Sequence, residues 1–204
     1  MRPLYLPLLL LVASCTQHAS PQQENACVYT HQRPIVALVP VVDNTHSNLP
    51  WSLSEELTSA IHYRLMQKDT FYLIDQEKIR KCKTIDNPFG SDLTWIKKAF
   101  FQNEFVVFLE LISHEETAAK DSPTELSMKM RIRVIDVRQE EPVVILQEII
   151  HDSHYLPKQF TGDHFHQIEW GKENYNISPL GIAHTQLSRE VASRIEDYVL
   201  LATK

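Results

Sequence analysis

One segment of the chain alternates strictly between apolar and polar residues, and this pattern restricts the possible folds more than any other. Every second residue from 126 to 134 is apolar, and the residues between them are Ser127, Lys129, Arg131 and Arg133. A period of two is typical of a β-strand with one face in the core and one in water. The chain must therefore build a sheet and cover one side of it.

A second strand is expected to pair with the first as a hairpin. It covers residues 143–150 and follows a polar turn from Arg138 to Pro142. The basic row Lys129, Arg131 and Arg133 then lies on the wet face, where Glu148 across the hairpin would balance it. The alternative is a contact surface for an anionic partner, such as a glycan or a lipid headgroup.

The segment 35–74 has the pattern of a βαβ unit. An apolar run at 35–42 predicts a buried strand, Ser52 and Glu55 form a capping-box spacing, and the helix they open continues to Lys68. A short strand at 71–74 follows. A helix between two strands allows the strands to lie parallel in one sheet.

The other expected elements are helices at 76–83, about 93–103 and the C-terminus, a turn at 87–90, and a strand at 105–112. Residues 114–124 and 151–181 are expected to be irregular. A parallel unit and a later hairpin predict an α/β (α+β) fold, with a mixed sheet of about five strands and helices packed on it.

The N-terminus carries a short secretory signal. Arg2 supplies a positive charge, residues 4–12 are almost entirely apolar, and Ala13-Ser14 are small. The run is much shorter than the roughly 20 residues that span a bilayer. Val12-Ala13-Ser14-Cys15 resembles the lipobox of bacterial lipoproteins, which implies cleavage before Cys15 and its acylation. In such lipoproteins, a residue other than aspartate after the cysteine favours sorting to the outer membrane, and here that residue is Thr16.

This N-terminus divides the chain into three parts. Residues 1–14 are the signal peptide, 15–34 a lipidated, polar and flexible linker, and 35–204 a single globular periplasmic domain. Acyl chains on Cys15 would anchor the protein to a membrane. Cys27 and Cys82 then remain as an even pair that an oxidising compartment allows to form a disulfide; two free thiols are the alternative.

The composition argues against several classes of function. The net charge of −6 gives no basic stripe for nucleic acid. Four glycines leave little for phosphate-cradling loops, and no Gly-x-Ser-x-Gly elbow occurs. Adjacent acids such as Glu55-Glu56 point in different directions. We expect a protein without enzymatic activity or cofactor.

Histidines suggest a second kind of site. His151 and His154 precede a second group, His164 and His166, with Asp152 and Asp163 among them. Imidazole and carboxylate are good ligands for zinc and other divalent metals. The alternative function is thus a lipoprotein that binds a metal or small ligand through the loop 151–166.

Part of the chain resembles a periplasmic domain of bacterial envelope proteins. The resemblance lies in residues 35–44, 53–65 and 71–79. This kind of domain occurs at the N-terminus of TolB, in the curli secretion lipoprotein CsgG, and in LpoB, which is a lipoprotein activator of peptidoglycan synthases. Its strand with a Pro-x-x-Asp-Asn-like end is similar to residues 40–44, and a later strand is similar to 131–138. The glycine of its hairpin is absent from 138–142, which argues against a CsgG-like channel.

These observations predict a lipoprotein of the bacterial cell envelope, anchored at Cys15 and facing the periplasm from the outer membrane. The resemblance implies that its domain binds a protein partner in cell-wall or outer-membrane assembly. An envelope hydrolase is the third hypothesis.

Overall fold

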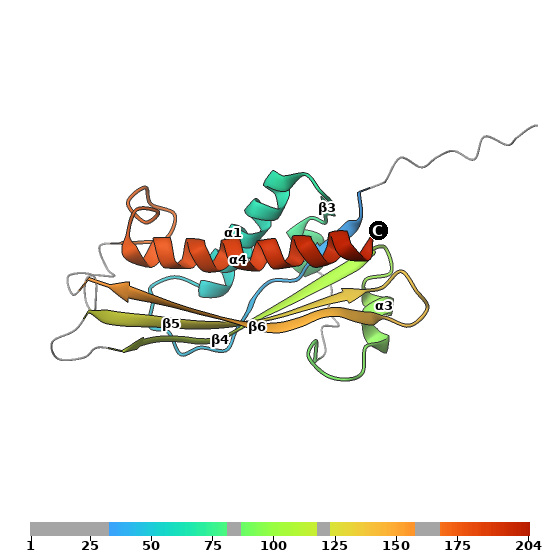
Figure 1. Ribbon diagram of the computed structural model, residues 1–204, viewed down its shortest axis with the longest axis horizontal. Coiled ribbons are helices and arrows are strands. Elements are labelled where there is room, and N and C mark those ends of the chain that lie inside the picture. The colour runs from blue at the N-terminus through green and yellow to red at the C-terminus, as the bar shows by residue number, and fades with distance from the viewer. Residues whose placement is uncertain (1–32, 81–86, 118–122, 158–167) are drawn as a thin grey trace, which may run out of the picture. The chain divides into compact units, whose positions relative to one another are not determined.

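Six strands form one mixed sheet in the computed structural model, which describes residues 33–80, 87–117, 123–157 and 168–204 (Figure 1). The order is β3-β1-β4-β5-β6, and β2 pairs with β4. The short strands run parallel to their neighbours, whereas β4, β5 and β6 are antiparallel. The bounds are β1 (Ile35–Leu38), β2 (Val42–Asp43), β3 (Tyr72–Leu73), β4 (Phe105–Thr117), β5 (Thr124–Asp136) and β6 (Val143–Leu156). The predicted α+β class and βαβ unit are confirmed.

The sheet has one strand more than expected because Pro40 interrupts the first apolar run. Proline has no N–H to donate to a strand ladder. The neighbouring amides still find partners: Val39 donates to the carbonyl of Val107 at 3.0 Å, and Val41 donates to Oγ1 of Thr58 at 2.8 Å. Val42–Asp43 then pairs with β4 as a separate strand.

Four helices complete the described part of the chain: α1 (Leu53–Lys68), α2 (Gln76–Arg80), α3 (Thr94–Ala99) and α4 (Pro179–Ala202). The predicted cap of α1 is confirmed, since Oγ of Ser52 accepts the amide of Glu55 at 3.2 Å. Ser178 caps α4 in the same way, with Pro179 in its first turn. No helix of the described residues has the length and apolar character needed to cross a membrane.

Helices cover the two faces of the sheet to different extents (Figure 1). On one face α1 and α4 pack on the sheet, and one apolar stripe of each helix lies in the core. On the other face α2 and α3 bury a smaller cluster that includes Ala37, Val106 and Phe108. This second layer covers the region around β1 and the first half of β4.

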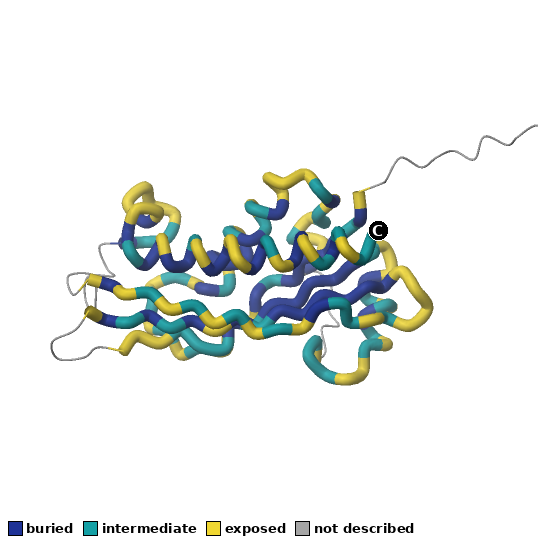
Figure 2. Tube along the Cα trace, viewed as in Figure 1, coloured by how far each residue is buried: buried dark blue, intermediate teal, exposed yellow. Residues whose placement is uncertain are grey.

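The second halves of β4 and β6 lie beside the first half of β5. This end of the sheet therefore has one face without a helix on it, which we call the open face. Figure 2 shows exposed and half-buried residues alternating along the end of β6, and mostly buried and half-buried residues alternating along the start of β5. The open face includes Ser113, Glu115 and Thr117 of β4, Glu125, Ser127, Lys129 and Arg131 of β5, and Gln147, Ile149, His151, Ser153 and Tyr155 of β6. Residues 114–117 and 151–156 belong to strands, so their assignment to irregular segments was wrong. Their polar side chains suit strands that are covered on one side only.

Candidate functional site

The basic row lies on the predicted face of β5, but its members have different environments. Arg133 is only 8% exposed. Its Nε donates to Oε1 of Gln147 at 2.7 Å, and its NH1 donates to the carbonyls of Pro88 and Gly90 at 2.9 and 2.7 Å. Arg133 thus fastens the predicted turn 87–90 to the sheet.

Arg131 and Lys129 lie further out along β5. The guanidinium of Arg131 forms a 2.8 Å ion pair with Glu110 and lies 5.2 Å from the ring centroid of Phe89. Lys129 is exposed and makes no ion pair with any described residue. It is the member of the row that a partner can reach most easily.

Glu148 does not balance this row, contrary to the sequence-based expectation. The pairing of β5 with β6 shifts by one residue between Val134 and Ile135, so Ile145 is an extra residue on β6. Without this bulge Glu148 would lie opposite Arg131. In the structure Glu148 lies opposite Ile132, on the side of α4, and its Oε1 is 3.7 Å from Nε of Arg194.

The open face contains a hollow and two exposed apolar side chains. The hollow has a volume of about 560 Å³ and is lined by Phe89, Arg131, Gln147, Glu148 and Ile149. Ile149 is 55% exposed, and Tyr155, which lies further along β6 on the same face, is 74% exposed. Apolar, aromatic and arginine side chains together are typical of the centre of a protein interface.

The candidate metal ligands on β6 do not converge. His151 lies on the open face, where its Nε2 is 3.0 Å from Oγ of Ser127. His154 lies on the opposite face, and its Nε2 is 2.9 Å from Oδ2 of Asp152. Within the described ranges no group of three or more His, Cys, Asp and Glu residues could hold a metal ion. His164, His166, Cys15, Cys27 and Cys82 lie outside the described residues.

A buried polar cluster connects α1, α4 and β4. Glu56 of α1 and His184 of α4 are each 2% exposed, and Nδ1 of His184 lies 2.7 Å from Oε1 of Glu56. Trp51 donates from Nε1 to Oε2 of the same carboxylate at 2.7 Å, and the hydroxyl of Tyr175 donates to Oε1. The ring of Trp51 meets that of Tyr175 edge-on, with centroids 5.6 Å apart. These contacts supply the partners that a buried carboxylate requires.

His114 extends the cluster into the sheet. Its Nε2 is 2.9 Å from Nε2 of His184. A bulge at Ile112 makes this contact possible, because the pairing of β4 with β5 shifts between Leu111 and Ser113. The extra residue turns His114 to the face that carries α4; an unbroken alternation would have pointed it to the open face.

The cluster alters the proton affinities of its members. Burial raises the pKa of Glu56, but the hydrogen bond and charge of His184, together with the hydrogen bonds from Tyr175 and Trp51, outweigh it, so the net pKa lies below the usual value. Burial, with the charge of His184 second, lowers the pKa of His114 to about 4. Burial and the Glu56 carboxylate raise the pKa of the Tyr175 hydroxyl well above its ordinary range. His114 is therefore neutral at pH 7.

The arrangement of acid, imidazole and hydroxyl resembles an acid–base relay in its residue types, but its geometry is closed. Solvent reaches 2% of Glu56 and of His184. A substrate has no route to the carboxylate or to Nδ1 of the imidazole in this conformation. General acid–base catalysis requires such access, so the geometry favours a structural role for the cluster.

Sequence reasoning missed this cluster, although a signal was present. His184 lies three residues before Leu187, in line with the apolar stripe of α4, and Glu56 lies three residues after Leu53 on α1. An acid and a base on the apolar faces of two helices predict a buried pair. Trp51 is a further partner of this pair.

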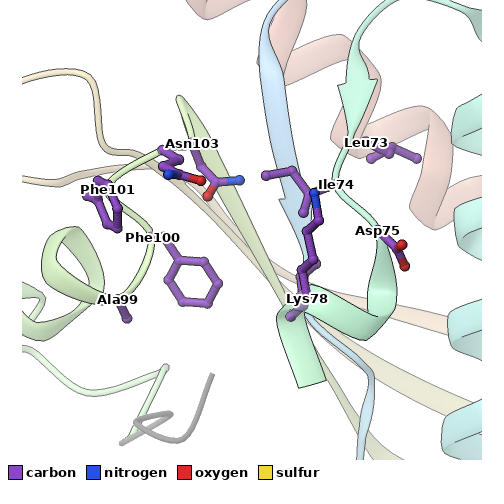
Figure 3. Close-up of a pocket in the computed structure, with 10 residues that line it drawn as sticks. Leu73, Ile74, Asp75, Lys78, Ala99, Phe100, Phe101 and Asn103 are labelled. Carbon is purple, nitrogen blue, oxygen red and sulfur yellow. The ribbon is translucent and has the colours of Figure 1, made fainter. Parts of the chain in front are cut away.

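A second hollow lies on the face that carries α2 and α3 (Figure 3). It measures about 330 Å³, and Figure 3 shows Ile74 and Lys78 on one side and Phe100 and Asn103 on the other. Nδ2 of Asn103 is buried without a hydrogen-bond partner. The hollow suits a small apolar group that carries one acceptor.

The comparisons with known proteins identify relatives of the fold. A model of a family of unknown function, DUF7499, matches residues 23–203. The structure of hypothetical protein CT253 from Chlamydia trachomatis has a TM-score of 0.67 and 27% identity, covering 82% of this chain and 98% of that one. Protein XCC0632 from Xanthomonas campestris has a TM-score of 0.51 and 6% identity, with coverages of 84% and 90%. Lipoprotein GNA1162 from Neisseria meningitidis has a TM-score of 0.44 and 9% identity, with coverages of 78% and 99%. No match to a curated protein was found.

Removing the buried carboxylate should destabilise the domain strongly. We expect Glu56→Ala to lower the free energy of unfolding by about 3–5 kcal/mol, because His184, Tyr175 and Trp51 lose their common partner. Denaturant unfolding followed by tryptophan fluorescence measures the change. The exposed neighbour provides the control: Glu55→Ala should cost less than about 1 kcal/mol. Equal costs for the two variants would contradict the structural role of the cluster.

Acid should destabilise the domain below about pH 6.5. Between pH 6.5 and 4 the unfolded chain binds a proton at His114 that the folded chain does not bind. The free energy of unfolding therefore falls as the pH falls, by at most about 1.4 kcal/mol per pH unit. Glu56 acts in the same direction at lower pH, since its folded pKa is depressed. His114→Gln removes the titrating group, so a pH slope unchanged by this variant would refute the assignment.

Proposed function

This chain belongs to the DUF7499 family, and we propose that it is a lipid-anchored protein of the bacterial envelope whose domain binds a protein partner through the open face. In this proposal the anchor is Cys15, the membrane is the outer membrane, and the domain faces the periplasm. The role is binding, without catalysis or a cofactor, in the assembly of the cell wall or outer membrane.

The anchor is supported by the sequence Val12-Ala13-Ser14-Cys15 and the apolar run before it. More than one acyl chain on a cysteine gives a stable membrane attachment, at about 0.8 kcal/mol per buried methylene. A domain without a membrane-crossing helix in its described part is compatible with this mode of attachment.

The observation that carries the binding function is the open face itself. Ile149 and Tyr155 are exposed on one sheet surface, where Arg131 lies opposite Ile149 and lines the same hollow, and Lys129 lies opposite His151, between these two positions of β6. Exposed apolar side chains grouped on one surface indicate a binding site. The surface fits a protein whose apolar side chains meet Ile149 and Tyr155 and whose carboxylate meets Lys129.

The closed polar cluster supports a binding role over a hydrolase. Glu56 and His184 satisfy each other and their neighbours in the core. The metal-binding alternative gains no support from β6, since His151 and His154 point to opposite faces.

Labelling with palmitate tests the anchor. The wild-type chain, expressed in a bacterial host, should incorporate the label and sediment with the outer membrane. Cys15→Ala should lose the label and the membrane attachment, while a Cys27→Ala control should keep both. Retention of the label in Cys15→Ala would exclude this anchor.

Site-specific photo-crosslinking tests the open face. A photoreactive aromatic residue in place of Ile149 or Tyr155 should capture the same envelope protein, and Lys129→Glu should reduce this capture at least several-fold. Phe101 is the matched control, because it is also 74% exposed but lines the hollow shown in Figure 3, outside the open face. Capture of that protein from position 101 but not from 149 and 155 would place the interface elsewhere.

A further inference from the structure

The outer surface of the helix layer contains a basic groove between α1 and α4. It has a volume of about 550 Å³ and is lined by side chains from two successive turns of each helix. Its lining residues are Tyr63, Arg64, Gln67, Lys68, Arg189, Ala192 and Ser193. A basic groove is notable in a chain whose net charge is −6.

Two guanidinium groups share the groove without a carboxylate between them. Lys68 is neutralised by Glu196, with Nζ 2.6 Å from Oε2. Arg64 uses NH1 to donate to the carbonyl of Ala60 at 2.9 Å, which leaves most of its five donors available. Neither Arg64 nor Arg189 forms an ion pair with any residue in the described ranges.

This juxtaposition has an electrostatic cost that an anion would remove. Burial lowers the pKa of Arg64, and the charge of Arg189 lowers it further. Two like charges destabilise each other, and an oxyanion bound between them attracts both guanidinium groups, which offsets their repulsion. Guanidinium groups match the oxygens of phosphate with paired hydrogen bonds.

The remaining lining residues favour a phosphate on an amphiphile. The amide of Gln67 and the hydroxyl of Ser193 can donate to further phosphate oxygens. Tyr63, which lines the groove, is 63% exposed on α1, so the groove presents an aromatic ring to solvent. Exposed tyrosine next to arginine is typical of surfaces that lie at a membrane interface.

The groove also lies where the linker joins the domain. Arg33, the first described residue, forms an ion pair with Asp69, the C-cap of α1, and lies over the ring of Tyr72. Asp69 directly follows Lys68, which lines the groove. The attachment point of a lipid-anchored chain therefore adjoins the basic groove.

We propose that this groove binds the phosphate of a membrane lipid headgroup, with Arg64 and Arg189 as its two principal ligands. The lipid source rests on the proposed anchor at Cys15, whereas the affinity for phosphate depends only on the groove. Binding would hold the α1–α4 layer against the membrane and direct the open face, on the other side of the sheet, away from it.

Vesicle binding by the full chain with Cys15→Ser tests this proposal without help from acyl chains. The vesicles contain either phosphatidylcholine alone or phosphatidylcholine with about 30% phosphatidylglycerol, at constant ionic strength. We expect binding to the anionic vesicles and a loss of about fivefold for each arginine removed, hence about 25-fold for Arg64→Gln/Arg189→Gln. Arg64→Lys/Arg189→Lys should retain part of the affinity.

The matched control is Arg194→Gln/Lys172→Gln, which changes the net charge equally outside the groove. Equal losses for the two double variants, or no loss for Arg64→Gln/Arg189→Gln, would overturn the proposal. Inorganic phosphate forms the second arm: it should raise the melting temperature of the Cys15→Ser chain but not of Arg64→Gln/Arg189→Gln. Stabilisation by free phosphate without vesicle binding would overturn the lipid as its source. The palmitate label tests the anchor separately.

Discussion

The buried hydrogen-bonded pair of Glu56 and His184 is the interaction on which the helix layer depends. It joins α1 to α4 inside the core, and His114 connects it to β4. A buried charge without a partner destabilises a fold by several kcal/mol, so each helix needs the other in one position. Apolar stripes alone would tolerate sliding between the helices, whereas this pair permits one register. The same register fixes the relative positions of the α1 and α4 side chains that line the groove on the outer surface of these helices.

The sequence predicted the elements whose patterns are local. The Ser52 cap of α1, the turn at 87–90 and the alternation along β5 all appear where they were expected. Strand ends were missed at 114–117 and 151–156. Their side chains face water on one side of a partly covered sheet, so their composition is that of a loop, and only pairing with β5 makes them strands.

The candidate site could be predicted in part. The face of Lys129, Arg131 and Arg133 follows from the period of two and is confirmed. The ion-pair partners of these three basic residues depend on which residue of the neighbouring strand lies opposite each of them. The bulge at Ile145 places Glu148 on the other face of the sheet. The Glu56–His184 pair is a contact between residues 128 positions apart, so its members could be suspected from their helical faces but their pairing could not. The resemblance to TolB and CsgG stays a prediction.

The two bulges make residue count as important as residue identity in this sheet. Ile112 and Ile145 each add one position to a strand, and every side chain beyond them changes face. Loss of one residue between Leu111 and His114 would turn the imidazole outward without altering any other amino acid. When relatives of this chain are aligned, a one-residue gap inside β4 or β6 therefore marks a sheet whose two surfaces have exchanged their residues. Such a gap would separate proteins with this core and interface from those that share only the fold.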